Sequence, residues 1–485
     1  MVSCREPLGN GEAGAADHVG AIRDADEGVA DEHIAVDVAA PSKRRDDRNM
    51  AVEISGVTLC PSDDLITASC LDYPRTGPVD RYAFEVNGWV VSNAPVAEVE
   101  FVHEQSVVAC CELTVSRPDV AVMYSSSSQV GFWKAIGTAG LEPDFTVGVR
   151  VVFEDGRRRD IAEIRGKQQL SSTFTPSMQP IMVSTLGRSG GTWLMRMLAE
   201  HPEIIVHDRF PYETYVCGYW MHFLQVLAAP VDPSRVESFQ FWRDPERLPP
   251  FPYFFGGPLV HPTPTQDVVV DHWYFDQVEE FARVAQAAVE SFYREYASRR
   301  NSTIPAFFAE KSVQQKGVRT GHYDWIMRQL YPCGREISLV RDPRDRLASI
   351  LAFNARRGFV DFGRERVETD EQFVDVIRAD TLSFIQTWRS TSHRGPLLRY
   401  EDLVGSPTEQ IRAMLDALDL DSSPTIVDAM VKAGNEATVN VISHRTSPDA
   451  PSSIGRWKRD LDPRLQKICD EAFDGLLDEL GDNSY

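Results

Sequence analysis

The sequence lacks most of the features that would point to a metal centre, a membrane or a nucleic acid. Its eight cysteines are scattered, with no Cys-x-x-Cys pair and no histidine cluster at zinc-binding spacing, which is typical of thiols in a reducing compartment. No apolar run approaches the roughly 20 residues that span a bilayer, and no basic-then-apolar leader opens the chain. The net charge of −22 is opposite to what broad binding to nucleic acid requires. We therefore expect a cytoplasmic protein with no metal, no membrane span and no nucleic-acid partner.

The order of sequence patterns predicts three parts in the 485 residues. Residues 1–75 are rich in Gly, Ala, Asp and Glu and are expected to form a disordered acidic tail. Residues 76–170 contain short β-like runs separated by turns and are expected to form a small all-β sandwich, an accessory domain. Residues 171–485 alternate apolar strands with long helices, which predicts a three-layer α/β fold with a mostly parallel sheet. Within them, the Pro- and aromatic-rich segment 248–264 is interpreted as an ordered insertion near the substrate entrance.

The predicted strands of the α/β part are 182–185, 204–207, 307–310, 337–340 and 397–400. Its predicted helices are 191–200, 275–299, 323–330, 345–354, 370–390 and 408–418. Ligands of such folds bind at the carboxyl ends of the strands, so we expect the site residues at those ends.

The most informative segment runs from the strand 182–185 through a glycine turn into the helix expected from Gly191. A strand, a short Gly/Ser turn and a helix N-terminus together present backbone N–H groups and the positive end of the helix dipole to an anion. The sequence therefore predicts a phosphate-like ligand here, within reach of Arg188. The turn is not a Walker A loop, because it is too short and no Lys precedes Thr192.

A second motif follows the strand 337–340, where Arg341 is separated from Ser349 by eight positions. Pro343 ends the strand and opens a helix, so this guanidinium and this hydroxyl straddle a strand–helix junction and can bracket a second phosphate. The alternative is that Arg341 pairs with Asp342 in a structural ion network.

Together, the two motifs resemble those of the superfamily of sulfotransferases that use 3′-phosphoadenosine 5′-phosphosulfate (PAPS). Members carry a 5′-phosphosulfate loop and a 3′-phosphate motif in this order. The run Arg-Ser-Gly-Gly-Thr-Trp-Leu-Met-Arg-Met-Leu, followed by His-Pro-Glu, is similar to the Golgi-type carbohydrate and tyrosylprotein branch and its bacterial relatives. The cytosolic branch has a Lys in the position of Arg188. The resemblance covers roughly residues 178–465 and implies a P-loop fold, PAPS as donor and no required metal.

The resemblance also implies roles for individual residues. Residues 188–192 would cradle the 5′-phosphosulfate, and Arg188 would neutralise the leaving bridge oxygen. Arg341 and Ser349 would bind the 3′-phosphate. Arg456 lies in a segment similar to the one that closes over the nucleotide, although the sequence departs there from the cytosolic Arg-Lys-Gly pattern and a solvated basic patch is the alternative. The residues expected to bind the nucleotide are Arg188, Ser189, Gly190, Gly191, Thr192, Trp193, Arg341, Ser349 and Arg456.

Sulfuryl transfer needs a base for the acceptor proton and cations for the charge that builds on the nucleotide. Cytosolic relatives use a His two residues after a strand Lys. Here Lys311 matches that Lys, but Val313 stands in the His position. The Golgi-type branch instead uses a Glu after its His-Pro, and Glu213 is the candidate, although extra residues intervene.

Each of these two assignments has an alternative. Glu213 could cap or pair with the following helix, and Asp208 or His207 would be the next candidates for the base. Lys311 could contact the transferring sulfate or pair with its neighbour Glu310. A catalytic Glu213 should lie in a partly apolar pocket beside Phe210 and Tyr212, because burial makes a carboxylate a stronger base.

The sequence thus predicts a sulfotransferase that moves the sulfuryl group of PAPS to an acceptor hydroxyl or amine, with a carbohydrate as the expected acceptor, then a peptide tyrosine or a small alcohol. One alternative is a P-loop nucleotide-dependent kinase, which would need Mg²⁺ and a Walker-type Lys. Another is a non-catalytic nucleotide-binding protein in which the β-sandwich recognises a partner.

Overall fold

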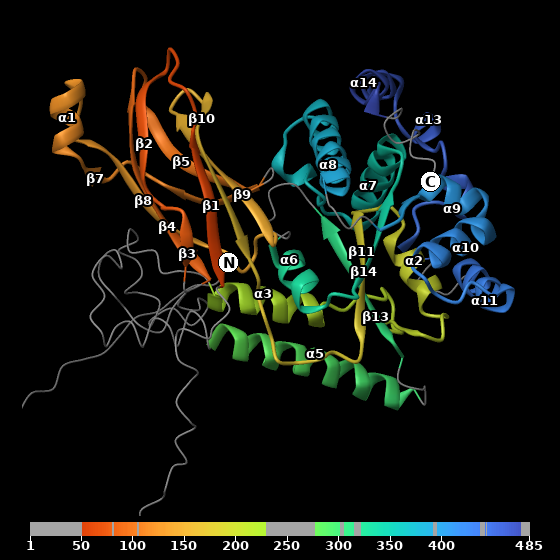
Figure 1. The fold of residues 1–485 in the computed structure, drawn as a ribbon. Helices are drawn as coiled ribbons and strands as arrows, with labels where there is room; N and C mark the ends of the chain where they lie inside the picture. Colours follow the sequence, from red (N-terminus) through yellow and green to blue (C-terminus); the bar gives the residue numbers. More distant parts are fainter. Residues whose placement is uncertain are drawn as a thin grey trace, which may run out of the picture. The chain divides into compact units, whose positions relative to one another are not determined.

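The computed structural model describes residues 51–79, 82–103, 106–228, 277–300, 305–314, 322–390, 395–436, 442 and 444–476 (Figure 1). They belong to one compact unit that begins at Met50. The segment 248–264, interpreted above as an insertion, and most of the predicted tail lie outside the described residues.

The first described part is β-rich and contains two antiparallel sheets. Their strand orders are β3-β1-β10-β9-β5-β6 and β2-β4-β8-β7 (Figure 1). The rings of Phe84 and Phe145 stack at 5.7 Å and those of Phe101 and Phe132 lie 6.3 Å apart, so the two sheets contact each other through their inner faces. The strands are β1 Val52–Leu59, β2 Ile66–Tyr73, β3 Gly77–Val79, β4 Ala83–Ser92, β5 Val96–His103, β6 Ser106–Cys111, β7 Val115–Ser116, β8 Gln129–Gly137, β9 Asp144–Phe153 and β10 Arg158–Gln168, with the short helix α1 Pro118–Tyr124 between β7 and β8.

The expected tail is wrong for residues 51–75, because β1 and β2 lie there and belong to these sheets. In β1 the side chains of Val52 and Ile54 are buried while Glu53 between them is exposed. This alternation is short and is surrounded by Gly, Ser and Asp. The composition of the segment therefore predicted disorder, and the strand pattern within it was not recognised. The extent and independence of an accessory domain stay predictions.

The second part is built on a five-stranded sheet of order β12-β13-β11-β14-β15, and all its strand pairings are parallel. This confirms the predicted parallel sheet for the α/β part. The observed strands are longer than expected, except at both edges of the sheet, because apolar periodicity marks only their buried centres. They are β11 Gln179–Leu186, β12 Ile204–Ile205, β13 Phe307–Gln314, β14 Arg335–Val340 and β15 Leu397–Arg399.

Helices pack on both faces of this sheet, as the alternation of side chains along β11 shows. Ile181 and Val183 are buried with residues of α2, α10 and α11, whereas Met182 is buried with residues of α3, α5 and α6. The helices are α2 Gly191–Leu198, α3 Val216–Ala228, α5 Val278–Arg299, α6 His322–Leu330, α7 Pro343–Arg357, α8 Asp370–Ser390, α9 Tyr400–Gly405, α10 Pro407–Ala417, α11 Pro424–Asn435, α13 Trp457–Asp460 and α14 Pro463–Phe473.

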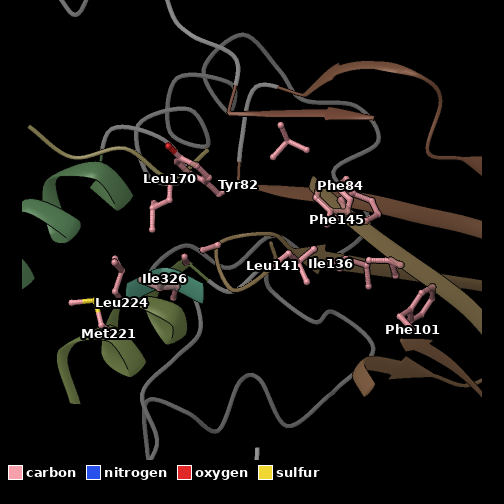
Figure 2. Close-up of a cluster of buried hydrophobic side chains, with 14 of the residues drawn as sticks. Tyr82, Phe84, Phe101, Ile136, Leu141, Phe145, Leu170, Met221, Leu224 and Ile326 are labelled. Carbon is pink, nitrogen blue, oxygen red and sulfur yellow. The ribbon is translucent and has the colours of Figure 1, made fainter. Parts of the chain in front are cut away.

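The β-rich part and the α/β part share one hydrophobic core. Figure 2 shows this cluster, in which Phe145 of β9 belongs to the same buried set as Leu224 of α3 and Ile326 of α6. Polar contacts accompany it: the hydroxyl of Tyr82 donates to Glu279 Oε1 at 3.0 Å. The β-rich part is therefore packed on the α3–α5–α6 layer rather than merely joined to it by a linker.

The strand order places a crevice at the carboxyl end of β11. After β11 the chain forms β12 and β13 on one side of β11 and then β14 and β15 on the other side, and such a switch point leaves room for a ligand beyond the strand ends. The glycine turn after β11 and the Arg341 motif after β14 both lie at this edge.

Candidate active site

The turn between β11 and α2 is close-packed and depends on glycine. Arg188 has φ 70° and Gly190 φ 97°, so two of its residues are left-handed. A Cβ at Gly187 would lie 2.6 Å from the ring of Phe362, and one at Gly190 would lie 2.5 Å from the ring of Tyr400. The turn delivers the chain to Gly191, where α2 begins and the first helical N–H groups have no intrahelical partner.

The Arg188 guanidinium extends from this turn across the crevice. It donates to His444 Nε2 at 2.8 Å and to the His444 carbonyl at 3.2 Å, and its Nε donates to Ser349 Oγ at 3.3 Å. Its Cζ lies 4.2 Å from the centroid of the Phe353 ring. The side chain therefore touches Ser349, the hydroxyl assigned to the second anion.

Arg341, at the end of β14, reaches the same place from the other side. Its Nη1 donates to the carbonyl of Arg188 at 3.2 Å and its Nη2 to the carbonyl of Ser453 at 2.6 Å. Its Cζ lies 4.6 Å from the centroid of the Tyr400 ring, and the side chain is only 6% exposed. Its buried Nε has no hydrogen-bond partner among the described residues.

The alternative of an Arg341–Asp342 ion pair is not what the structure contains. Asp342 pairs with Arg344 at 2.8 Å and accepts from the Arg344 backbone as the N-cap of α7. Arg344 also reaches Asp470 at 3.1 Å and covers the ring of Trp457. The structural ion network of this motif is therefore formed by its second arginine.

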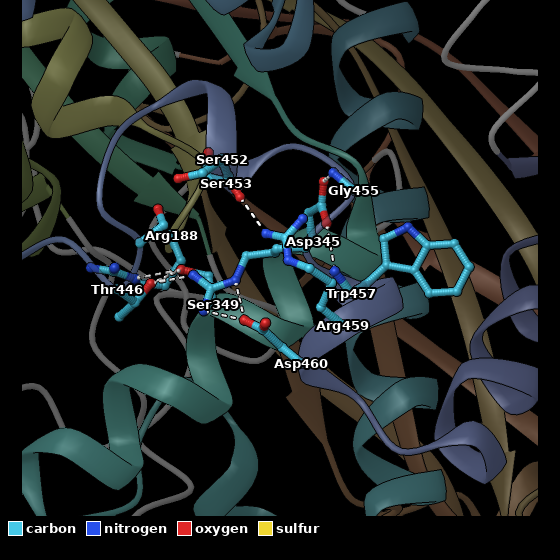
Figure 3. Close-up of polar contacts among 12 residues, drawn as sticks. Arg188, Asp345, Ser349, Thr446, Ser452, Ser453, Gly455, Trp457, Arg459 and Asp460 are labelled. Atoms are coloured by element: carbon cyan, nitrogen blue, oxygen red, sulfur yellow. Dashed lines mark hydrogen bonds and ion pairs between the residues drawn. The ribbon is translucent and has the colours of Figure 1, made fainter.

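Ser349 and Arg456 meet through Thr446. Ser349 Oγ and Thr446 Oγ1 are 3.2 Å apart, and Arg456 Nη1 donates to the same Thr446 oxygen at 2.5 Å (Figure 3). Arg456 is 3% exposed and forms an ion pair with Asp460 at 2.5 Å. The guanidinium is thus buried beside Ser349 rather than forming a solvated patch.

Asp345 anchors the segment that carries Arg456. Its two carboxylate oxygens accept from the backbone of Gly455 at 2.7 Å and of Trp457 at 3.0 Å (Figure 3). Burial raises the pKa of Asp345 above its ordinary value, against the two backbone donors. The C-terminal segment is therefore fixed to the first turn of α7, beside Arg341.

Lys311 and Glu213 form the other end of the site. Lys311 lies on β13, opposite Val183 of β11, and its Nζ forms an ion pair with Glu213 and a 3.3 Å hydrogen bond to Thr192 Oγ1. Glu213 Oε2 also accepts from the hydroxyl of Tyr215 at 3.0 Å. The base candidate and the glycine turn are thus connected through one ammonium group.

The surroundings of Glu213 are less apolar than expected. Phe210 lines the same cavity and Tyr212 is buried beside it, but the carboxylate contacts a cation and its side chain is 23% exposed. The next candidates for the base lie elsewhere: Asp208 accepts from the Tyr296 hydroxyl and His207 stacks on the Tyr296 ring, and neither lines the cavity.

Arg188 and Lys311 are buried beside other cations, and both effects lower their pKa values. Burial, with Arg341 and Arg456 nearby, lowers the pKa of Arg188 to about 10. Burial, with Arg188 nearby, lowers the pKa of Lys311 to about 8. Both groups thus remain protonated at neutral pH but at a cost in free energy that an anion would offset.

Both motifs line one cavity of about 300 Å³, the lower end of the range for small-molecule sites. Ser189 is the exception among the expected nucleotide-binding residues: it is fully buried and its hydroxyl lies outside the cavity lining. The lining includes Arg188, Gly190, Gly191, Thr192, Trp193, Glu213, Lys311, Arg341, Ser349 and Arg456.

The cavity also has lining residues that the sequence did not reveal, above all His444 and Tyr400. Burial and the cations Arg188 and Lys311 lower the pKa of His444 to about 4, so it is a neutral imidazole. His444 belongs to no recognisable sequence motif, and its place in the site becomes apparent only from its contact with Arg188 of the glycine turn. The polar run from His444 to Ser447 is the sole signal that could have been followed.

The chain belongs to the sulfotransferase family, because the family model described as "Sulfotransferase family" matches residues 180–424, just over half of the chain. Members of this family are enzymes that transfer sulfuryl groups. Membership of the Golgi-type branch stays a prediction. No curated protein matches the chain. Among the described residues, no helix has the length and apolar character to cross a membrane.

Three solved structures are distantly similar to the chain. The sulfotransferase domain of the Synechococcus PCC 7002 olefin synthase is 18% identical, with 64% of this chain and 98% of that chain covered and a TM-score of 0.34. Mouse sulfotransferase SULT7A1 complexed with PAP is 12% identical, with 63% and 86% covered and a TM-score of 0.33. A sulfotransferase from Alicyclobacillus acidocaldarius is 13% identical, with 64% and 95% covered and a TM-score of 0.31.

Proposed function

We propose that this protein transfers the sulfuryl group of PAPS to an acceptor hydroxyl or amine, with Glu213 as the base. One observation supports the donor above all others. Arg188 and Arg341 are buried around one cavity, and within the described ranges neither forms an ion pair. A buried cation without an ion-pair partner is costly, so the arrangement favours a ligand with two separate anionic groups.

PAPS has its two anionic groups on opposite sides of one ribose. We place the 5′-phosphosulfate at the glycine turn, where Arg188, Gly190, Gly191 and Thr192 line the cavity and α2 begins. The 3′-phosphate then lies at Arg341, Ser349 and Arg456. A nucleotide such as ATP, whose phosphates form one chain, would leave Arg341 without an ion-pair partner.

The proposed reaction is a single in-line displacement. The acceptor oxygen or nitrogen forms a bond to sulfur while the bond from sulfur to the bridging 5′-phosphate oxygen breaks, and PAP leaves. The acceptor proton passes to the Glu213 carboxylate. Lys311 contacts both Glu213 and Thr192, so its ammonium lies where it can stabilise charge on the bridging oxygen, together with Arg188. No metal is needed for this displacement.

For the acceptor we propose a carbohydrate hydroxyl, on the resemblance of the glycine-turn motif to the carbohydrate branch. The cavity residues alone do not discriminate a sugar from another alcohol, so a panel of glycans, tyrosine peptides and small alcohols is the first assay, with radiolabelled PAPS as donor and EDTA present. Transfer in EDTA to any acceptor distinguishes this function from a Mg²⁺-dependent kinase. PAP binding without transfer to any acceptor would leave a non-catalytic nucleotide-binding protein.

The base is tested by Glu213→Gln. We expect turnover to fall by about 10²- to 10⁴-fold, the usual contribution of general-base catalysis, while PAP binds as before. Glu203→Gln is the matched control, because Glu203 is exposed and lies outside the cavity lining. Near-normal turnover of Glu213→Gln would remove the base assignment while leaving the donor assignment intact.

A further inference from the structure

Glu310 is a fully buried carboxylate that the proposed reaction does not use. It precedes Lys311 on β13, but neighbouring strand residues point to opposite faces of a sheet. Lys311 faces the cavity and α2, whereas Glu310 lies with Phe308 on the face covered by α3 and α5 and is 1% exposed. Burying a carboxylate is costly unless its partners are well placed, so its contacts are informative.

Among the described residues, the hydrogen bonds identified to the Glu310 carboxylate come from the helices of this layer. Its Oε1 accepts from the backbone N–H of Cys217 at 2.7 Å, and its Oε2 accepts from that of Gly218 at 3.1 Å. The hydroxyl of Tyr293, on α5, also donates to Oε1. Because α3 begins at Val216, the two backbone donors belong to its first turn, where N–H groups lack intrahelical partners and the helix dipole favours a negative charge.

Two adjacent residues of β13, Glu310 and Lys311, therefore bind the short segment from Glu213 to Gly218 at two places. Lys311 holds Glu213 directly on the cavity side, and Glu310 holds the start of α3 on the other side. Only Thr214 and Tyr215 separate Glu213 from the first residue of α3. The position of the helix start thus limits where the Glu213 carboxylate can lie.

We propose that Glu310 is a positioning residue for Glu213: by binding the first turn of α3 it fixes the base relative to the glycine turn. The proposal rests on the proposed function of the site. Burial raises the pKa of Glu310 to about 7, against the hydrogen bonds from Tyr293 and α3, and a buried charge is in general no more stabilising than an apolar side chain of similar volume. What an apolar side chain would lack is any hydrogen bond to α3.

The test compares Glu310→Ala with Glu310→Gln in the full chain, using the acceptor found in the panel. For Glu310→Ala we expect kcat to fall about 10- to 100-fold, the loss that a misplacement of about 1 Å can cause, with the Kd for PAP changed less than about twofold. Gln keeps an acceptor for Cys217 but not for Gly218, so we expect Glu310→Gln to lose only about three- to tenfold in kcat. Glu290→Ala is the matched control, since Glu290 is a buried carboxylate that also accepts from a backbone N–H, that of Ser177, and its hydrogen bonds identified among the described residues come from Ser177 and Arg294 rather than from α3.

A double variant separates positioning from general destabilisation. Glu310 acts through Glu213 in this proposal, so Glu310→Ala added to Glu213→Gln should cost no further kcat, whereas independent losses would multiply. Unchanged kcat in Glu310→Ala, a multiplicative double variant, or an equal loss in Glu290→Ala would each overturn the proposal. If Glu310→Ala does not fold, Glu310→Gln decides: reduced kcat with unchanged PAP affinity supports it and unchanged kcat refutes it. The proposed function fails separately, if the wild-type protein transfers no sulfuryl group, and its base assignment alone fails if Glu213→Gln remains active.

Discussion

Replacing Arg341 with Ala should remove the discrimination between PAP and adenosine 5′-monophosphate, AMP. Arg341 is 6% exposed. Among the described residues its Nε has no hydrogen-bond partner, and its Nη1 and Nη2 donate to carbonyl oxygens. A 3′-phosphate at this place would gain a charge-assisted hydrogen bond in a site largely shielded from water. Such a bond contributes about 1.5 to 3 kcal/mol, so PAP should bind about 10- to 150-fold more weakly to the variant.

AMP lacks the 3′-phosphate, so its affinity should change less than about threefold in the same variant. Calorimetric titration of both nucleotides into both proteins gives the difference directly. Arg344→Ala is the matched control: Arg344 comes from the same motif, but pairs with Asp342 and Asp470 outside the cavity. Equal losses for PAP and AMP in Arg341→Ala would refute the assignment of the 3′-phosphate to this arginine, and so would a loss of PAP discrimination in the control.

Two further predictions concern the cations and the closing segment. Because the pKa of Lys311 is lowered to about 8, its charge is present at pH 7 and lost as the pH rises through 8, so the affinity for PAP measured by calorimetry should fall about tenfold from pH 7 to 9. In Lys311→Arg, whose guanidinium stays protonated, the affinity should not change over this range. If the affinity of Lys311→Arg also falls, another group is responsible for the pH dependence. Asp345→Asn leaves one of the N–H groups of Gly455 and Trp457 without its acceptor and should cost about 1 to 3 kcal/mol of unfolding free energy and weaken PAP binding. Asp462→Ala, which removes the N-cap of α14, should lower the melting temperature without affecting PAP binding, and equal effects of the two variants on PAP would contradict the role of Asp345.

The α/β part could be predicted from the sequence because its elements follow strong local patterns. The apolar runs at β11 and β14 are each followed by a residue that ends a strand or begins a helix, Gly187 and Pro343, and parallel strands place such ends at one edge. The same reasoning predicts that Arg188 and Arg341 lie at one edge of the sheet, and their side chains do line one cavity. The position of a residue at the carboxyl end of a parallel strand was thus more useful for predicting the site than the identity of any single residue.

The residues that were missed come from loops whose approach depends on tertiary packing. His444 reaches Arg188 because its ring lies between Phe210 and Phe353, with centroid distances of 5.4 and 5.3 Å, and these three residues are distant in the sequence. Tyr400 looked like the end of a strand, yet it begins α9 and its ring packs against the glycine turn. Neither role leaves a periodic pattern, so sequence alone could not assign it.

The adjacent charged residues Glu310 and Lys311 of β13 show how a strand buried on both faces determines the partners of its charged side chains. Glu310 and Lys311 interrupt an apolar strand, and from the sequence a pairing between them competed with contact of Lys311 to the sulfate. A strand covered on both faces excludes the pairing, because its neighbouring side chains point apart, and each charge must then find a partner in a different layer. Lys311 finds Glu213 and Thr192 on the cavity side, while Glu310 finds the start of α3. Two buried charges that would each be costly alone therefore connect the cavity to the helix layer behind it, and this connection is why a residue remote from the donor can govern the position of the base.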